Sequence, residues 1–438
     1  MGGVDRRFRA LVAAHAVSSY GNYLNLIALS LFSYEVAGTA FGVGAVMALR
    51  LFSGFLAGLV AGGLLARATR RTVMVCTDVA QVTAMAVLAM TASHTPPWLL
   101  GCAVVVMGAG NTLFNVSLRS AVPVMVGQEA RARANGLLVA ARSWATVLGF
   151  ASAAPVIGFG GYATAFAVNA ASFAVSAAAL LVLRPRTDDR GAAGGEVPGP
   201  SAEQGAGASS RPAAGGRPGL AALGVPALLA GMIALRALDA LASSSHNVAL
   251  PVVADSNGST DPAVFMTQFW AAWAVGTFLA QQVLRRRTDS SAWGARAFAV
   301  GTCAMSISFV LAFTGLPAVA LVLASVSAGF ADGCTEIVYT SRLQATPDRQ
   351  RSRLFGLSAT AETSGFTVGT VSAAAALEAL PALVVVGAFH GVAVCGALVL
   401  LALTTVSGGT APPRSSTSAD EGEESHGTRP GAGTVPGA

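Results

Sequence analysis

The sequence has little charge and no lysine. Only 11% of its 438 residues are charged, whereas soluble domains have about 25% charged residues. A soluble chain of this length would form two or three domains, and each would need a polar surface that this composition does not supply. The shortage disfavours a soluble enzyme, a disulfide scaffold and a disordered chain, and it leaves a polytopic membrane protein.

The motifs of several enzyme classes are also absent. The sequence contains no phosphate-binding loop, no hydrolase nucleophile elbow and no Cys/His cluster with metal-ligand spacing. The five cysteines all fall in apolar stretches, as small buried hydrophobic residues do. We therefore expect a protein that is not an enzyme, has no cofactor or metal, and takes its energy from an ion or substrate gradient.

The arginines form short clusters between apolar runs rather than one basic surface, which disfavours a nucleic-acid partner. The clusters lie at residues 6–9, 67–71, 131–133, 184–190, 285–287 and 349–353. The alternate loops contain no arginine near Glu35, His94, Gly160, Asp255, Gly315 and Glu378. This one-sided pattern predicts a multi-pass protein of the plasma membrane with both termini and all the arginine clusters on the cytoplasmic side.

Long apolar runs dominate what is present. The chain is 53% hydrophobic, its mean hydropathy is +0.62, and a membrane-spanning helix needs about 20 apolar residues. Such runs fall at 10–33, 41–66, 73–92, 98–119, 134–158, 162–183, 221–250, 263–284, 293–313, 316–341, 354–378 and 381–404. The first run is too long for the apolar part of a signal peptide, so we interpret it as a retained span.

These runs predict an all-α membrane protein with twelve transmembrane helices in two six-helix bundles. The predicted domains are an N-terminal bundle at 1–183, a flexible cytoplasmic linker at 184–219, a C-terminal bundle at 220–405 and a disordered cytoplasmic tail at 406–438. The linker and tail are rich in Gly, Ala and Pro, so they cannot bury a core.

The two groups of spans repeat a short motif. Residues 131–137, RARANGL, open the fifth span, and residues 351–357, RSRLFGL, open the eleventh. Each span continues to a matching glycine, Gly149 or Gly369. Parallel repeats of six spans are one construction used by membrane transporters.

Twelve spans arranged as six plus six, a long central loop and repeated half motifs resemble the major facilitator superfamily. Residues 120–142, SAVPVMVGQEARARANGLLVAAR, and residues 165–173, AFAVNAASF, are similar to the branch that holds siderophore and macrolide exporters. The resemblance implies alternating access between two bundles. It also implies membrane lipid, a small-molecule substrate and protons as partners, and a monomer.

The sequence departs from the family pattern in two places. The loop after the second span usually reads Gly-x-Leu-Ala-Asp-Arg and helps to latch the two halves, but here Arg67 stands in place of the acid. Either Asp78 substitutes for it or, as the simpler interpretation, Asp78 pairs with a nearby loop arginine. The Gly-Pro pair of the antiporter motif is absent too, because Phe150 follows Gly149.

Polar residues inside the spans are the candidates for function, because each is costly in lipid and usually faces the bundle interior. The predicted cavity residues are Asn22, Asn25, Arg50, Asn111, Asn115, Arg142, Arg236, Asp239, Gln268 and Glu362. The asparagines either line the substrate path or form hydrogen bonds between helices. Arg236 and Asp239 are close enough in one helix to form a structural pair, and Arg50 either contacts substrate or neutralises an acid.

Asp332 and Glu336 are the candidates for proton coupling. They lie one helical turn apart, where two carboxylates repel, so one of them should bind a proton or have a basic partner. The alternative is permanent pairing with Arg50 or Arg142. Arg142 and Glu362 occupy matching repeat positions, which predicts an ion pair between the halves in at least one conformation.

The sequence thus predicts a secondary active transporter, with proton-coupled export of an amphipathic drug-like or natural-product molecule as the leading hypothesis. An importer of a small polar metabolite and a non-transporting membrane scaffold or sensor remain as alternatives.

Overall fold

The computed structural model describes residues 6–187, 227–256, 261–285, 294–346 and 348–408. The predictions for the linker beyond residue 187 and for the tail beyond residue 408 lie outside these residues. Within them the chain is helical and contains no strand. The first half of the chain holds α1 Arg6–Ala37, α2 Ala40–Arg67, α3 Arg70–Thr91, α4 Pro97–Ala151 and α5 Ala153–Leu183. The second half holds α6 Ala227–Ser256, α7 Pro262–Arg285, α8 Ala295–Ala312, α9 Ala318–Gln344, α10 Asp348–Leu377 and α11 Ala382–Gly408.

Two glycine turns divide α4 and α5 into three spans. Gly127 has φ 75° and ψ 168° inside α4, and Gly161 has φ 65° inside α5. Both lie in the positive-φ region that glycine adopts without strain, so the chain can reverse there between spans. With these turns, each of the twelve predicted spans is present as a helical segment, and the predicted fold class is confirmed.

The seventh span differs from its predicted bounds of 221–250. Residues 221–226 lie outside the described part of the chain, and α6 continues through Pro251 to Ser256. Pro251 does not end the helix, because a proline inside a membrane helix is tolerated when neighbouring groups take up the freed backbone carbonyl.

Nine of the described helical segments are long and apolar enough to cross a membrane. The three that fall short are α1, the part of α4 after Gly127, and α10. These segments hold Asn22, Arg142 and Glu362, three of the polar residues predicted to face the interior. A span of lower hydropathy fits a position where one side faces polar groups rather than lipid.

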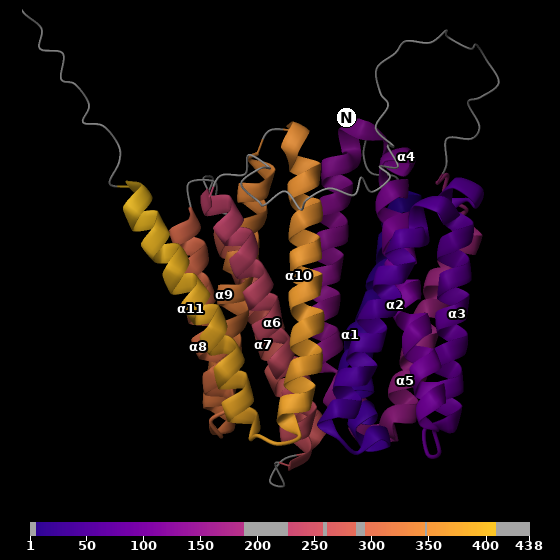
Figure 1. The fold of residues 1–438 in the computed structure, drawn as a ribbon. Helices are drawn as coiled ribbons and strands as arrows, with labels where there is room; N and C mark the ends of the chain where they lie inside the picture. The colour runs from indigo at the N-terminus through magenta and orange to yellow at the C-terminus, as the bar shows by residue number, and fades with distance from the viewer. Residues whose placement is uncertain (1–5, 188–226, 257–260, 286–293, 347, 409–438) are drawn as a thin grey trace, which may run out of the picture.

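The helices form two bundles that lie side by side (Figure 1). In the first half α1 packs on α4 and α5, while α3 bridges the same two helices. In the second half α6 packs on α10 and α11, and α9 packs on α7 and α8. The halves meet along two seams, α2 with α10 and α4 with α7.

Both described ends of the chain lie at the same end of the molecule, drawn at the top of Figure 1. We call this end the arginine face, because α1 begins there at Arg6 and the α2–α3 loop places Arg67 and Arg70 there. The other end, which holds the loop from Leu377 to Ala382, is called the opposite face.

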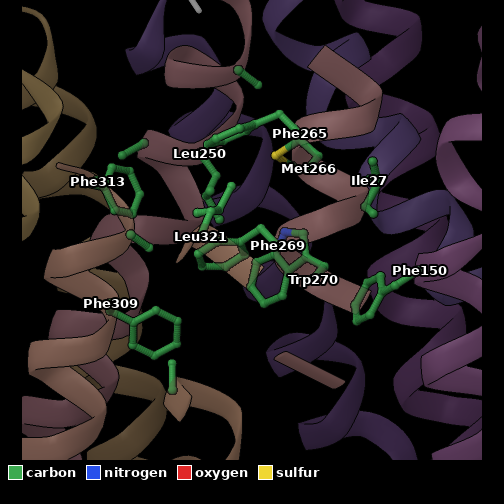
Figure 2. Close-up of a cluster of buried hydrophobic side chains, with 14 of the residues drawn as sticks. Ile27, Phe150, Leu250, Phe265, Met266, Phe269, Trp270, Phe309, Phe313 and Leu321 are labelled. Carbon is green, nitrogen blue, oxygen red and sulfur yellow. The ribbon is translucent and has the colours of Figure 1, made fainter. Parts of the chain in front are cut away.

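An apolar cluster joins the two halves near the opposite face. Figure 2 shows Phe150 of the first half beside Trp270 of the second half, with Phe269 next to Trp270. Ile27 of the first half and Leu250 of the second half belong to the same cluster. The rings of Phe150 and Trp270 are stacked with centroids 5.6 Å apart. The backbone N–H of Phe41 also donates to Glu378 Oε1 across 2.7 Å at this face. The opposite face is therefore the closed end of the space between the halves.

The two arginines that begin α3 bind carbonyls at and just after the C-terminal end of α5. Arg71 Nε donates to the carbonyl of Leu180 across 3.0 Å, and Arg70 Nη1 donates to the carbonyl of Thr187 across 2.7 Å. Unpaired carbonyls at a helix C-terminus attract cations. Asp78 instead is only 1% exposed and lies beside the hydroxyl of Ser176. The expected pairing of Asp78 with a loop arginine is wrong, because α5 supplies closer partners for these guanidinium groups.

Small residues bring α2 and α4 together. Gly54 lies against Gly108 and Thr112, and a side chain at Gly108 would collide with the backbone carbonyl of Arg50. Close approach of this kind is typical of small residues between membrane helices. Gly62, four residues after Gly58 on the same stripe, has open space where a side chain would begin. Only the part of the stripe near Gly54 packs closely on α4, and this part fixes the backbone of α2 at Arg50.

Candidate functional site

A charged cluster lies inside the second half, where α6, α9 and α10 meet. The Arg236 guanidinium of α6 is its centre. Arg236 Nη2 lies 2.7 Å from Glu336 Oε2 of α9 and 3.2 Å from Glu362 Oε1 of α10. Arg236 Nη1 lies 3.3 Å from Asp239 Oδ2 on its own helix. The expected pair of Arg236 and Asp239 is therefore present, as part of a larger network.

The acids of this cluster differ in exposure. The Asp239 side chain is 6% exposed, whereas those of Glu336 and Glu362 are 52% and 44% exposed. Asp332, one turn before Glu336, lies outside these ion pairs but near enough to Arg236 to interact electrostatically. One guanidinium therefore faces four carboxylates. Because exposed carboxylates in the middle of a span avoid lipid, Glu336 and Glu362 must face water or a polar cavity.

Two adjoining cavities lie on the side of the first half. The first, which we call the apolar cavity, has a volume of about 470 Å³. Its walls include Leu26, Leu29, Met47, Leu51 and Phe55, together with Phe366 of α10. The second, called the polar cavity, has a volume of about 140 Å³. Its walls include His15, Asn22, Tyr23, Asp78, Gln81, Asn115 and Arg142. The two cavities share Leu26, Arg50 and Asn111, so Arg50 stands at their boundary.

The two arginines of the polar cavity have different surroundings. Arg142 Nε donates to the hydroxyl of Tyr23 across 2.9 Å. The Arg50 guanidinium forms no hydrogen bond or ion pair with any residue in the described part of the chain. Permanent pairing of Arg50 with Asp332 or Glu336 is therefore absent here.

Not all of the predicted cavity residues come together. Asn22, Arg50, Asn111, Asn115 and Arg142 line the polar cavity. Asn115 Nδ2 donates to the carbonyl and the side-chain oxygen of Asn111, so these two amides bond within one helix rather than between helices. Asn25 is fully buried inside the first half, and its side chain lines neither cavity. Gln268 of α7 also lines neither cavity.

Arg142 and Glu362 have separate partners in this conformation. Arg142 contacts Tyr23 of the first half, and Glu362 contacts Arg236 of the second half. Their pairing in another conformation stays a prediction.

Sequence reasoning missed a buried histidine pair. His246 Nδ1 of α6 lies 3.2 Å from His390 Nε2 of α11, and the two residues are 2% and 0% exposed. The ring of Phe309 stacks on His246 with a centroid distance of 3.9 Å. Arg236, Asp239, Ser243 and His246 follow one another at helical spacing in α6, which is the one signal in the sequence that draws attention to His246. Nothing in the sequence identifies His390 as its partner. Tyr23 was missed as well, although it stands beside Asn22 in α1.

Comparisons with known proteins agree with this architecture. The chain is similar to a solved structure described as the POT family transporter PepTSo, with 12% identity, a TM-score of 0.65, and coverage of 93% of this chain and 99% of that chain. It is also similar to a bacterial homologue of the iron transporter ferroportin in an inward-facing state. There the identity is 15%, the TM-score is 0.63, and the coverage is 92% of this chain and 98% of that chain. No curated protein sequence matches.

The family itself is shown by sequence. Residues 11–370 match the family model described as Major Facilitator Superfamily. That match spans most of both bundles, so the chain belongs to the Major Facilitator Superfamily, a family of multi-pass membrane transporters rather than enzymes.

Proposed function

We propose that this secondary transporter couples proton movement to the export of an amphipathic drug-like or natural-product molecule by alternating access. The observation that carries the proposal is the cluster in which Arg236 forms ion pairs with Asp239, Glu336 and Glu362. Asp332 lies near enough to interact with Arg236 as well. Four carboxylates around one guanidinium repel one another unless some of them bind protons.

Protons bound by the cluster would change how strongly α6 is held to its neighbouring helices, because Arg236 joins them. Its ion pairs hold α6 to α9 and α10. A proton bound by Glu336 or Glu362 removes the charge that attracts Arg236, so one of these contacts weakens. The two conformations of a transporter differ by only a few kcal/mol in free energy. The loss of one ion pair in one of them therefore shifts the population toward the other.

The apolar cavity supports an amphipathic substrate, because its walls are mainly aliphatic and aromatic and its volume of about 470 Å³ falls in the range of small-molecule sites. Export is supported by the resemblance of residues 120–142 to the exporter branch. The one-sided arginine clusters support a cytoplasmic arginine face and cytoplasmic termini. The monomer and the plasma-membrane location belong to the same proposal.

The test begins with a screen that compares accumulation of amphipathic compounds in cells with and without the protein. The compound most strongly depleted is then followed in proteoliposomes under an imposed pH gradient. Asp332→Asn and Glu336→Gln should abolish uphill transport and leave downhill exchange measurable. Glu35→Gln, which changes an exposed acid outside the cluster, is the matched control and should transport as the wild type does.

Unchanged gradient-driven transport in both single variants and in the double variant would remove these two acids from the coupling mechanism. Accumulation in cells that contain the protein would favour the importer. Absence of flux for every compound, from a protein that remains folded, would favour the scaffold or sensor.

A further inference from the structure

Arg50 is a cation without a protein partner. It lies near the middle of α2, and its guanidinium forms no hydrogen bond or ion pair with any residue that the structure describes. It nevertheless lines both cavities. Arg70 and Arg71 at the start of α3, by contrast, bind the carbonyls of Thr187 and Leu180.

An unpaired charge at this depth needs a reason. Removing a cation from water is expensive, and ionisable residues inside membrane spans usually pair with one another or mark a substrate path. The close packing of Gly54 and Gly108 fixes the backbone of α2 at Arg50, and Arg50 lines both cavities from that position. An anion that arrives from outside the protein would supply the missing partner.

The polar cavity fits the head group of such an anion. Its volume of about 140 Å³ is large enough for a carboxylate, sulfonate or phosphate. Arg142 lines the same cavity as Arg50, while Asp78 of α3 is the one carboxylate in its walls and lies against Ser176 of α5. The anion would therefore lie nearer the two guanidinium groups, whose planar donors match carboxylate and phosphate oxygens.

The apolar cavity fits the rest of the molecule. It shares the Arg50 wall and extends along Leu51 and Phe55 of α2 to Phe366 of α10. Phe55 is 49% exposed and Phe52, on the same helix, is 55% exposed. The cavity thus runs from a cationic inner end to the apolar seam between α2 and α10.

We propose that the substrate is an amphipathic anion whose acidic group binds Arg50 in the polar cavity and whose apolar body fills the apolar cavity. The inference rests on the proposed transport function and names the substrate class of that same site. It assigns the acidic group to the first half of the chain, apart from the carboxylates around Arg236.

Equilibrium dialysis at one fixed pH tests the proposal without any gradient. The probes are naphthaleneacetate, its neutral primary amide, and naphthylethylammonium, which share one ring and differ in charge. The protein is held in phosphatidylcholine nanodiscs, and protein-free nanodiscs correct for partition into lipid. The variants are Arg50→Gln, Arg50→Lys and, as the matched control, Arg119→Gln, whose arginine is exposed and lines neither cavity.

The wild-type protein and Arg119→Gln should prefer the acid over the amide and the amine. Arg50→Gln should lose roughly tenfold to a hundredfold in affinity for the acid, as expected for a hydrogen bond between charged groups, and should bind the amide as before. Arg50→Lys keeps the charge but not the planar pair of donors, so it should still prefer the acid over the amide but with reduced affinity. Competition by acetate or by phosphatidylglycerol then shows whether a small anion or a lipid head group occupies the same site.

Equal binding of acid and amide by the wild type, or no binding of either, overturns the proposal, and so does an equal loss of affinity for both probes in Arg50→Gln.

Thermal unfolding without ligand gives an independent test of whether Arg50 has a protein partner. Arg50→Gln should not lower Tm, because it removes a charge that has no protein partner; a clear fall in Tm would reveal a structural partner and sink the idea. Because this assay needs no transport, failure of proton coupling at Asp332 and Glu336 would be seen separately.

Discussion

The guanidinium of Arg236 and the carboxylate of Glu336 lie 2.7 Å apart and join α6 to α9. The same guanidinium reaches Glu362 of α10 and Asp239 of α6. One side chain thus links three helices of the second half through charged hydrogen bonds. Such a centre affects both the stability of that half and the movements that it permits.

Substitution of Arg236 should destabilise the protein more than substitution of its exposed partner. Arg236→Gln leaves Asp239, whose side chain is 6% exposed, without a cation, and breaking a buried pair costs about 3–5 kcal/mol. Glu336→Gln removes a carboxylate that is 52% exposed, so its cost should stay below about 1 kcal/mol. Thermal unfolding in detergent, with Glu35→Gln as control, measures the difference. Equal losses of Tm in the Arg236 and Glu336 variants would contradict this ranking.

Glu378 should help to keep the opposite face closed. Its carboxylate accepts from the Phe41 N–H at the N-terminus of α2, where a negative charge is favourable by about 0.3–1 kcal/mol. Glu378→Ala should therefore raise the reactivity of a cysteine placed at Leu31, which is 4% exposed in the closed cluster, by about twofold to fivefold. The measurement is the labelling rate with a membrane-impermeant maleimide in a background without native cysteines.

The control for this experiment is Glu35→Ala at the same face. Glu35 is exposed and makes no hydrogen bond to the second half among the described residues. If both variants accelerate labelling equally, the effect is one of general surface charge and the contact between Phe41 and Glu378 does not hold the face closed.

Cysteine labelling should also place the arginine face in the cytoplasm. Ala92 lies at the C-terminal end of α3, at the opposite face, and Arg67 ends α2 at the arginine face. In a cysteine-free background, Ala92→Cys should react with an impermeant reagent added outside intact cells. Arg67→Cys should react only after permeabilisation. Reaction of Arg67→Cys from outside would reverse the proposed orientation.

The spans could be predicted because each depends on a local property. A run of about 20 apolar residues needs no knowledge of its neighbours, and the arginine clusters mark alternate loops in the same local way. The turn at Gly127 falls between the predicted fourth and fifth spans. The bounds of α6 were less predictable, because Pro251 is read from sequence as a helix end and only packing determines whether the helix continues.

The sequence could identify the residues of the site but not which of them contact one another. Arg50, Arg142, Arg236 and Glu362 stand out because charge is rare in a span. Their partners depend on distances of a few ångströms between helices, and a sequence repeat aligns two helices only to about one turn. Glu362 therefore pairs with Arg236 rather than Arg142 here, and His390 meets His246.

The two halves lie on either side of the space between them and contain opposite charges, which we call the cationic wall and the acidic wall. Arg50 and Arg142 belong to one wall, and the acids around Arg236 belong to the other. Closing that space in an empty, unprotonated carrier would bring opposite charges together, so electrostatic attraction would favour the return step. Protons bound by the acids would weaken this attraction, and an anion bound at Arg50 would weaken it from the other side. The rate of the return step would thus depend on whether protons occupy the acids and whether an anion occupies Arg50. Because the attraction is electrostatic, this rate would also depend on ionic strength.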